Sequence, residues 1–192
     1  MHGAAAGGGP GQQRWRHYTG SAGKTTVNMD SLVIMGVAGC GKSSLGAAVA
    51  REHGMLLVEG DERHSAESLD KMRQGVALTD EDRSGWLDAL AAELAARPQG
   101  IVVSCSALRR AYRDRLRRSL PGLRFVFLEI DRANAQARVA ARAGHFFAPS
   151  LVDSQFATLE SPRGEPGVLC VDALALPQRQ RAEVSGWLLR RT

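Results

Sequence analysis

Long apolar runs are missing from this 192-residue sequence. No stretch approaches the ~20 apolar residues that a membrane-spanning helix requires, and residues 1–28 lack the apolar core of a secretory signal. Cysteine is scarce as well. The three cysteines are far apart, a pattern that fits reduced thiols better than a disulfide framework or a zinc site. These absences predict a cytoplasmic protein that does not enter a membrane.

The net charge of the chain is small when the N-terminal segment is excluded. The formal net charge is +5, but residues 1–29 hold three basic residues and no acidic one. The rest of the chain carries 22 basic and 20 acidic residues, which is no electrostatic footprint for nucleic acid. Residues 1–29 are rich in glycine and alanine without hydrophobic periodicity, so we expect a disordered extension there. A single domain is expected over residues 30–192.

The most informative stretch is an apolar strand that leads into a glycine-rich loop. Residues 32–35 are apolar, residues 36–43 match G-x-x-x-x-G-K-S, and a helical pattern follows. This order of strand, loop and helix identifies a P-loop. Its backbone N–H groups bind the phosphates of ATP, Lys42 reaches the β- and γ-phosphates, and the Ser43 hydroxyl ligates Mg²⁺. The predicted nucleotide-binding residues of the loop are Gly36, Val37, Ala38, Gly39, Cys40, Gly41, Lys42, Ser43 and Ser44.

Apolar strand patterns alternate with amphipathic helix patterns along the remaining chain. Because the strands are nearly all apolar, the predicted fold class is α/β, a P-loop kinase fold with a five-stranded parallel sheet, helices on both faces and a small lid. The P-loop would lie at the carboxyl ends of the strands. Further strands are expected at 55–58, 101–105, 125–130 and 168–171, and helices at 79–100, 108–120, 131–142, 150–159 and from 177 on.

Two carboxylates stand at the end of the second predicted strand. Glu59 and Asp61 are separated by Gly60, and strand alternation places both on one face, directed at the phosphate-transfer site. One of them can hold a Mg²⁺-bound water, and the other can accept the proton of an attacking hydroxyl. A solvated acidic turn is the alternative interpretation.

Basic residues gather again near residue 140. Arg138 and Arg142 lie four residues apart on a predicted helix that approaches Gly144 and His145. This arrangement suits a lid, at about residues 138–150, whose arginines close on the transferring phosphates. A surface helix with solvated arginines is the alternative. Six arginines between residues 109 and 118 show helical periodicity and are predicted to lie mostly on the solvent side of their helix.

Several blocks of the sequence resemble the P-loop gluconokinases, in unbroken order over about residues 31–172. The resemblance implies ATP-dependent phosphorylation of D-gluconate at its 6-hydroxyl, Mg²⁺ dependence, and a fold similar to shikimate and nucleoside monophosphate kinases, often as a homodimer. The blocks are the P-loop, Glu59-Gly60-Asp61 with His64, Lys71-Met72, Leu78-Thr79-Asp80-Glu81-Asp82-Arg83 with Trp86-Leu87, Cys105-Ser106-Ala107-Leu108, Tyr112-Arg113-Asp114, Gly144-His145-Phe146 and Gln155-Phe156 with Leu159-Glu160.

The resemblance also implies roles for single residues. Asp61 would orient the attacking hydroxyl, and Ser43 and Glu59 would serve the Mg²⁺. Arg138 and Arg142 would belong to the lid over ATP. The implied catalytic residues are Lys42, Asp61 and Arg142, and the implied substrate-binding residues are Asp61, His64, Lys71, Arg83 and His145.

Two other functions stay open. The sequence departs from the family pattern at Glu59, Ser65, Ser68 and Gly85, which allows a kinase for another small polyol or sugar acid, such as a shikimate-like acceptor. A nucleotide-binding regulator without transfer activity is the second alternative. The combination of an acceptor carboxylate with a lid arginine argues against that regulator. The expected partner is a small sugar acid, with neither nucleic acid nor membrane.

Overall fold

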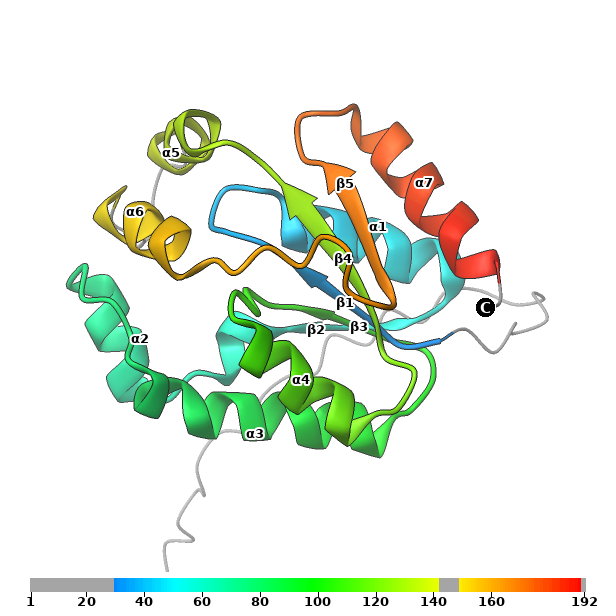
Figure 1. The fold of residues 1–192 in the computed structure, drawn as a ribbon, viewed down its shortest axis with the longest axis horizontal. Coiled ribbons are helices and arrows are strands. Elements are labelled where there is room, and N and C mark those ends of the chain that lie inside the picture. Colours follow the sequence, from blue (N-terminus) through cyan, green and yellow to red (C-terminus); the bar gives the residue numbers. More distant parts are fainter. Residues whose placement is uncertain (1–29, 142–148, 191–192) are drawn as a thin grey trace, which may run out of the picture.

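A computed structural model describes residues 30–141 and 149–190 as one α/β layer structure (Figure 1). Its centre is a single five-stranded sheet in the order β2-β3-β1-β4-β5, and every strand pair is parallel. This confirms the predicted fold class. The strands are β1 (Leu32–Met35), β2 (Leu56–Glu59), β3 (Ile101–Ser104), β4 (Arg124–Glu129) and β5 (Val168–Asp172).

Helices cover both faces of this sheet. In the described ranges none of them is both long and apolar enough to cross a bilayer. The helical elements are α1 (Lys42–His53), the short 3₁₀ helix η1 (Gly60–Arg63), α2 (Ala66–Arg73), α3 (Asp80–Ala96), α4 (Arg110–Ser119), α5 (Arg132–Ala140), α6 (Pro149–Thr158) and α7 (Pro177–Leu189).

The core consists of two apolar clusters, one on each face of the sheet. Successive side chains of a strand point to opposite faces, so Leu32 and Ile34 of β1 enter one cluster, while Val33 and Met35 enter the other. The first cluster is closed by α1 and α7, and the second by α3 and α4. All four β1 side chains are fully buried. The loop that follows β1 therefore starts from a fully buried strand.

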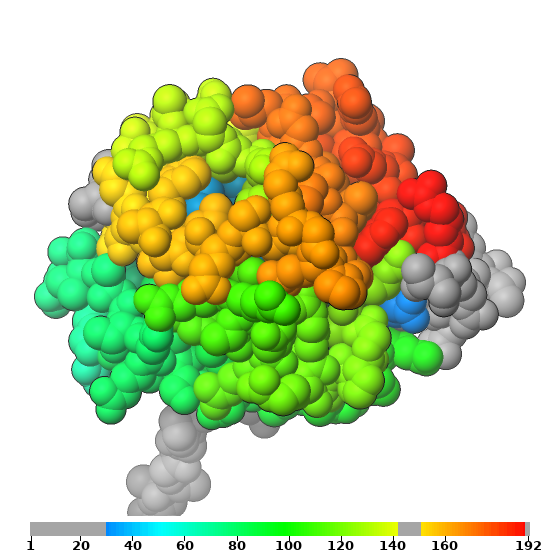
Figure 2. Space-filling view, in the orientation of Figure 1, coloured from blue at the N-terminus to red at the C-terminus, as the bar shows by residue number. Residues whose placement is uncertain are grey.

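The crevice for a ligand follows from the strand order. β1 lies between β3 and β4; the chain runs from β1 to β2 on one side and later crosses from β3 to β4 on the other, so a crevice forms outside the carboxyl ends of these strands. In the space-filling view, blue atoms of the segment that follows β1 are visible at the bottom of a hollow between α5 and α6 (Figure 2). The P-loop thus lies at the base of an open cleft.

Two helix predictions need correction. No helix was predicted at 66–73, where the structure places α2 with Ser65 as its N-cap. The helix predicted to reach residue 142 ends at Ala140, because Ala141 already forms its C-cap. Arg142 and His145 lie outside the described residues, as do residues 1–29 with their predicted disorder and most of the predicted lid.

The prediction for the basic run between residues 109 and 118 is wrong at Arg113. This side chain is fully buried, and its guanidinium donates to the carbonyl oxygens of Ala107 and Leu108 and to the carboxylate of Glu165. Of the six arginines, Arg110 and Arg118 alone are classed as exposed. Helical periodicity did not distinguish an internal ion pair from a solvated face.

Candidate active site

The P-loop keeps its shape through glycines at positions that exclude a side chain. Gly36 has φ +144°, and a Cβ atom there would lie 2.8 Å from both Cys40 Sγ and the Leu128 carbonyl oxygen. Gly41 caps α1 in the left-handed conformation at φ 101°. The first turn of α1 contains no acidic residue, so the positive end of the helix dipole is available to an anion. Lys42 folds back over the loop, and its Nζ donates to the carbonyl oxygen of Val37 at 3.1 Å.

Ser43 and Glu59 lie together at the edge of this loop. The Ser43 hydroxyl donates to Glu59 Oε2 at 2.9 Å, which joins the first turn of α1 to the last residue of β2. Two oxygen atoms at this spacing fit Mg²⁺, a hard cation that prefers oxygen ligands. Among the described residues no group of three or more His, Cys, Asp or Glu side chains forms a metal cluster. Mg²⁺ needs no such cluster, because it keeps waters and takes phosphate oxygens as ligands.

The β2–η1 turn fits only because residue 60 is glycine. A Cβ atom on Gly60 would lie 2.6 Å from the Ser104 carbonyl oxygen and 2.7 Å from Cys105 Cβ. The absence of a side chain lets the end of β2 approach the end of β3. Asp61 follows at once, in the first turn of η1. The position of this carboxylate is therefore set by the spacing of two hydrogen-bonded strands.

Asp61 lies between the donor loop and a second site. Burial raises the pKa of the Cys105 thiol to about 12, with Asp61 acting in the same direction and Lys42 in the opposite one. Both charges thus lie near the carboxyl end of β3. Asp61 also acts on His64, whose pKa it raises against a larger effect of burial. The turn that carries Asp61 thus runs from Glu59, which is hydrogen-bonded to Ser43, to His64.

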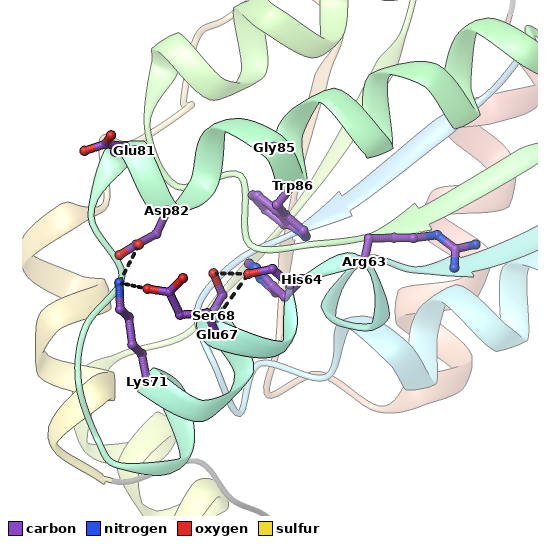
Figure 3. A pocket seen from close by; sticks show the side chains of 10 residues that line it. Arg63, His64, Glu67, Ser68, Lys71, Glu81, Asp82, Gly85 and Trp86 are labelled. Atoms are coloured by element: carbon purple, nitrogen blue, oxygen red, sulfur yellow. Dashed lines mark hydrogen bonds and ion pairs between the residues drawn. The ribbon is translucent and has the colours of Figure 1, made fainter. Parts of the chain in front are cut away.

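A cavity of about 600 Å³ opens beside His64, between α2 and α3 (Figure 3). Its walls carry several hydrogen-bonding groups, as a polyhydroxy molecule would require. The lining residues are Arg63, His64, Ser65, Glu67, Ser68, Lys71, Glu81, Asp82, Gly85 and Trp86.

Trp86 organises the inner end of this cavity. Its indole N–H donates to the Gly60 carbonyl oxygen at 2.7 Å, in a buried hydrogen bond. Its ring stacks on the imidazole of His64, with centroids 4.7 Å apart and planes 6° apart. Figure 3 shows the two rings side by side. One side chain thus holds both the turn that carries Asp61 and the histidine that lines the cavity.

We predict that Trp86→Phe lowers kcat by about 10- to 100-fold, because a small displacement of reacting groups has effects of that size. Phenylalanine keeps an aromatic ring beside His64 but removes the N–H that binds Gly60. The KM for ATP should stay unchanged, and steady-state kinetics checks both constants. Trp187→Phe is the matched control, since Trp187 lies in α7 and packs on Arg124 of β4. An unchanged kcat in Trp86→Phe would show that the indole hydrogen bond does not position the turn.

His64 is neutral at physiological pH. Burial lowers its pKa to about 4, from an ordinary value of 6.5, and Asp61 only partly opposes this effect. Its Nδ1 atom is buried without a hydrogen-bond partner among the described residues. A neutral imidazole can both donate and accept, so it suits a hydroxyl ligand rather than an anion.

The depressed pKa makes folding stability depend on pH. Between pH 6.5 and 4 the unfolded chain binds a proton at His64 that the folded protein does not bind. The stabilisation present above pH 6.5 is therefore lost as the pH falls toward 4. We expect His64→Gln to remove this component, so that its free energy of unfolding falls less steeply with acidification than that of the native protein. Urea unfolding at a series of pH values measures the difference, and parallel curves would contradict it.

Comparisons with known proteins agree with this geometry. A family model described as an AAA domain matches residues 32–162, which is more than half of the chain. The thermoresistant gluconokinase of Escherichia coli is 40% identical over 154 residues, which cover 77% of this chain and 88% of that enzyme. The chain belongs to the gluconokinase family. The thermosensitive gluconokinase of the same organism is 39% identical over 139 residues, covering 71% and 74% of the two chains.

A solved structure of the same family shares this fold. A gluconokinase from Sinorhizobium meliloti 1021 superposes with a TM-score of 0.78 at 46% identity, covering 84% of this chain and 92% of that one. A shikimate kinase from Aquifex aeolicus has a TM-score of 0.54 at 14% identity and shares the fold alone. The predicted resemblance to gluconokinases and to the shikimate kinase fold is therefore confirmed.

Lys71 lies in the cavity of this gluconokinase family member with its charge already paired. Its Nζ contacts Asp82 Oδ1 at 2.7 Å and Glu67 Oε1 at 3.0 Å, as Figure 3 shows. Hydrogen bonding to Lys71 lowers the pKa of Asp82 to about 2. A substrate carboxylate would have to compete with two protein carboxylates for this ammonium group.

Arg83, the other residue expected to bind the substrate carboxylate or hydroxyls, is not among the described residues that line the cavity. It is buried, donates to the Leu78 carbonyl oxygen at 3.4 Å, and lies over the ring of Tyr112 with its guanidinium carbon 6.0 Å from the centroid. In this structure Arg83 closes the start of α3 against α4. A hydrogen bond joins Ser43 to Glu59, and the charges of Asp61 and Arg83 both act on His64, although neither residue lines the cavity.

Arg138 lies on the other side of the P-loop. Its guanidinium donates to the Ala173 carbonyl oxygen at 3.1 Å and to the Gly39 carbonyl oxygen at 3.5 Å. The side chain is exposed and links α5, the P-loop and the segment after β5. This position beside the loop is compatible with its expected contact with ATP.

Two residues of the site were not assigned to it from the sequence. Trp86 was recognised as part of a family block without a role, although the indole of a buried tryptophan needs a hydrogen-bond acceptor. Gln155 was recognised as part of a family block without a role. Its side-chain oxygen accepts from the Ala38 backbone N–H at 2.6 Å, inside the P-loop. No spacing rule connects positions 38 and 155, so the fold alone reveals this contact.

Proposed function

We propose that this protein transfers the γ-phosphate of ATP to the 6-hydroxyl of D-gluconate, which gives 6-phospho-D-gluconate and ADP. One observation carries the proposal. Asp61 lies in η1, between Glu59, which accepts from Ser43 of the donor loop, and His64 of the acceptor cavity. The gluconokinase relatives support the identity of the acceptor, since several are similar to this chain over two thirds of its length or more.

In this proposal the protein contributes positioning and charge, which are the main catalytic effects in phosphoryl transfer. Asp61 accepts the proton of the 6-hydroxyl as its oxygen attacks the γ-phosphorus, and the bond to the ADP oxygen breaks. Lys42 offsets the negative charge on the transferring group. Arg142, outside the described residues, is proposed to add a second cation from the lid. Mg²⁺ held by Ser43 and Glu59 would neutralise charge on the β- and γ-phosphates.

The cavity groups match the hydroxyls of a sugar acid. Neutral His64 can offer a hydroxyl its other ring nitrogen, Nε2, as a donor or an acceptor according to its tautomer, since Nδ1 is buried. Glu67 and Asp82 can accept from hydroxyls on the opposite wall, and Lys71 between them is proposed to bind the carboxylate. Ion-paired side chains within reach of one ligand would give the orientation that transfer to one hydroxyl requires.

A coupled assay of ADP release from ATP and Mg²⁺ tests the proposal, with gluconate, shikimate, other sugar acids, neutral polyols and nucleoside monophosphates as acceptors. We expect the highest kcat/KM with gluconate, and the phosphorylated carbon can be assigned by NMR. Absence of gluconate-dependent turnover in a preparation that binds ATP would remove gluconate as the substrate.

A second candidate is a kinase for a neutral polyol of similar length, and the pairing of Lys71 is the observation that favours it. Two carboxylates already neutralise this cation. A polyol could occupy the cavity without breaking either ion pair. The same assay separates the two functions, because a polyol kinase would have a higher kcat/KM for the alcohol than for the corresponding acid.

A further inference from the structure

A side-chain amide oxygen accepts a hydrogen bond from a backbone N–H group of the P-loop. Gln155 of α6 accepts the Ala38 N–H through Oε1 at 2.6 Å, between residues 117 positions apart in the chain. P-loop N–H groups ordinarily point at phosphate oxygens. A protein oxygen on one of them shows that α6 is docked directly against the phosphate-binding loop.

The position of Gln155 is set by contacts on both sides of α6. Towards the core, Val152 is fully buried and Phe156 packs against the apolar cluster on the α1 face. Towards α5, Asp153 accepts from Gln136 Nε2 at 3.0 Å and pairs with Arg132 at 3.4 Å. Because the helix is held on both sides, its contact with Ala38 is a property of the fold rather than of one surface rotamer.

The chemistry of the amide then determines what Gln155 presents to a ligand. An N–H donor can be accepted by the carbonyl oxygen alone, so the bond from Ala38 fixes which end of the amide is oxygen. The NH₂ group is the opposite end of the same planar group, and no partner for it is recorded among residues 30–141 and 149–190. Two donor hydrogens are thus available at the mouth of the P-loop.

The position of Lys42 indicates which phosphate these hydrogens would contact. Lys42, which serves the β- and γ-phosphates in a P-loop, has its Nζ on the carbonyl oxygen of Val37. Val37 directly precedes Ala38, whereas the amides that open α1 begin three residues later at Gly41. Gln155 therefore lies on the strand side of the loop, beside the Lys42 ammonium and away from the amides at the start of the helix.

We propose that Gln155 binds the γ-phosphate of ATP. Its carbonyl oxygen holds the Ala38 amide, and its NH₂ group donates to a γ-phosphate oxygen, so α6 distinguishes ATP from ADP. The inference rests on the proposed use of ATP as donor. It adds a neutral hydrogen-bond donor beside Lys42, contributed by the helix that follows the predicted lid.

Nucleotide affinities without any acceptor test this assignment. Gln155→Glu keeps an oxygen for Ala38 but replaces the NH₂ donor with a second oxygen. We expect its Kd for a non-hydrolysable ATP analogue to rise by about 10-fold or more, the effect of one hydrogen bond to a charged group. The Kd for ADP should change much less. Gln155→Met, which adds no charge, should shift the ratio of the two constants in the same direction. Titration calorimetry with Mg²⁺ present measures the Kd of each variant for the ATP analogue and for ADP.

Gln136→Ala is the matched control, since Gln136 also ties α5 to α6 but makes no recorded contact with the P-loop among the described residues. It should leave the ratio of the ATP-analogue and ADP constants at the native value. Equal losses for both nucleotides in the Gln155 variants would overturn the proposal, because Gln155 would then only support the loop. An unchanged ratio without any loss would overturn it as well. Neither result depends on gluconate, so failure here is distinct from failure of the proposed function.

Discussion

Replacing Asp61 with asparagine is expected to lower kcat by about 10²- to 10⁴-fold, the range attributed to a positioned general base. Asparagine has the same shape but cannot accept the hydroxyl proton. Gly60 fixes the backbone at this turn against β3, so the new side chain should occupy the same place. Binding of ATP should be nearly unchanged, because the donor contacts come from Lys42 and the P-loop.

Glu62→Gln is the control for this variant, since Glu62 is the next residue of η1, is exposed and does not line the cavity. It should retain native kcat. Stopped-flow or steady-state assays with saturating gluconate give kcat, and calorimetry gives the affinity for the ATP analogue. Native turnover in Asp61→Asn would remove the carboxylate from the mechanism, and a parallel loss of nucleotide affinity would point to damage in the donor loop.

Arg113→Met is expected to reduce the free energy of unfolding by about 3–5 kcal/mol, the usual effect of removing one partner from a buried ion pair. The guanidinium is fully buried between Glu165 and three backbone carbonyl oxygens, those of Ala107, Leu108 and Glu160. Methionine fills most of the volume but no longer donates to these acceptors, of which Leu108 keeps the Glu160 N–H and Glu165 keeps Arg117. Urea unfolding followed by circular dichroism measures the loss.

A second substitution separates charge from packing. Arg113→Met combined with Glu165→Met should recover part of the loss, because apolar replacement of a buried pair is often neutral and Arg117, which also pairs with Glu165, keeps Asp114 as a partner. Arg118→Met, on the exposed side of the same helix, should change stability by no more than about 0.5 kcal/mol. Equal stability of the Arg113 and Arg118 variants would contradict the structural role of Arg113.

Arg113 also supports the donor loop indirectly, through the segment that follows β3. The segment that it holds includes Ala107, which has a left-handed backbone at φ 42°, and Ser106, whose carbonyl oxygen accepts from the Gly36 N–H at 3.4 Å. Loss of Arg113 should therefore weaken nucleotide binding as well as stability. The internal ion pair connects the α4 side of the sheet to the phosphate site.

The sheet and the donor loop could be predicted from the sequence because their signals are local. Strands buried on both faces are continuous apolar runs, and the P-loop has fixed spacing between a strand and a helix. The carboxylates Glu59 and Asp61 were singled out by their place at a strand end, but strand alternation does not apply to Asp61, which lies in η1 beyond the end of β2. These features need no knowledge of distant parts of the chain.

The features that escaped prediction depend on contacts between distant residues or on weak patterns. α2 buries Ser68 alone, so its sequence has almost no apolar stripe. Arg113 has the same helical spacing as its solvated neighbours, and its partner Glu165 lies 52 positions away. The bonds from Trp86 to Gly60 and from Ala38 to Gln155 likewise join separate elements. Hydrophobic periodicity carries no information about such pairs.

The close approach at Gly60 has a consequence for how this enzyme can diverge. Asp61, the carboxylate proposed to accept the proton, follows β2, which is paired with β3, whereas one wall of the acceptor cavity is α2, a short helix with a single buried residue. Substitutions on α2 can therefore change which alcohol is accepted while the distance between donor and acceptor machinery stays constant. The residues proposed for phosphoryl transfer and those that select the acceptor therefore lie in different parts of the fold. A library of variants restricted to residues 65–72 is a route to new acceptors.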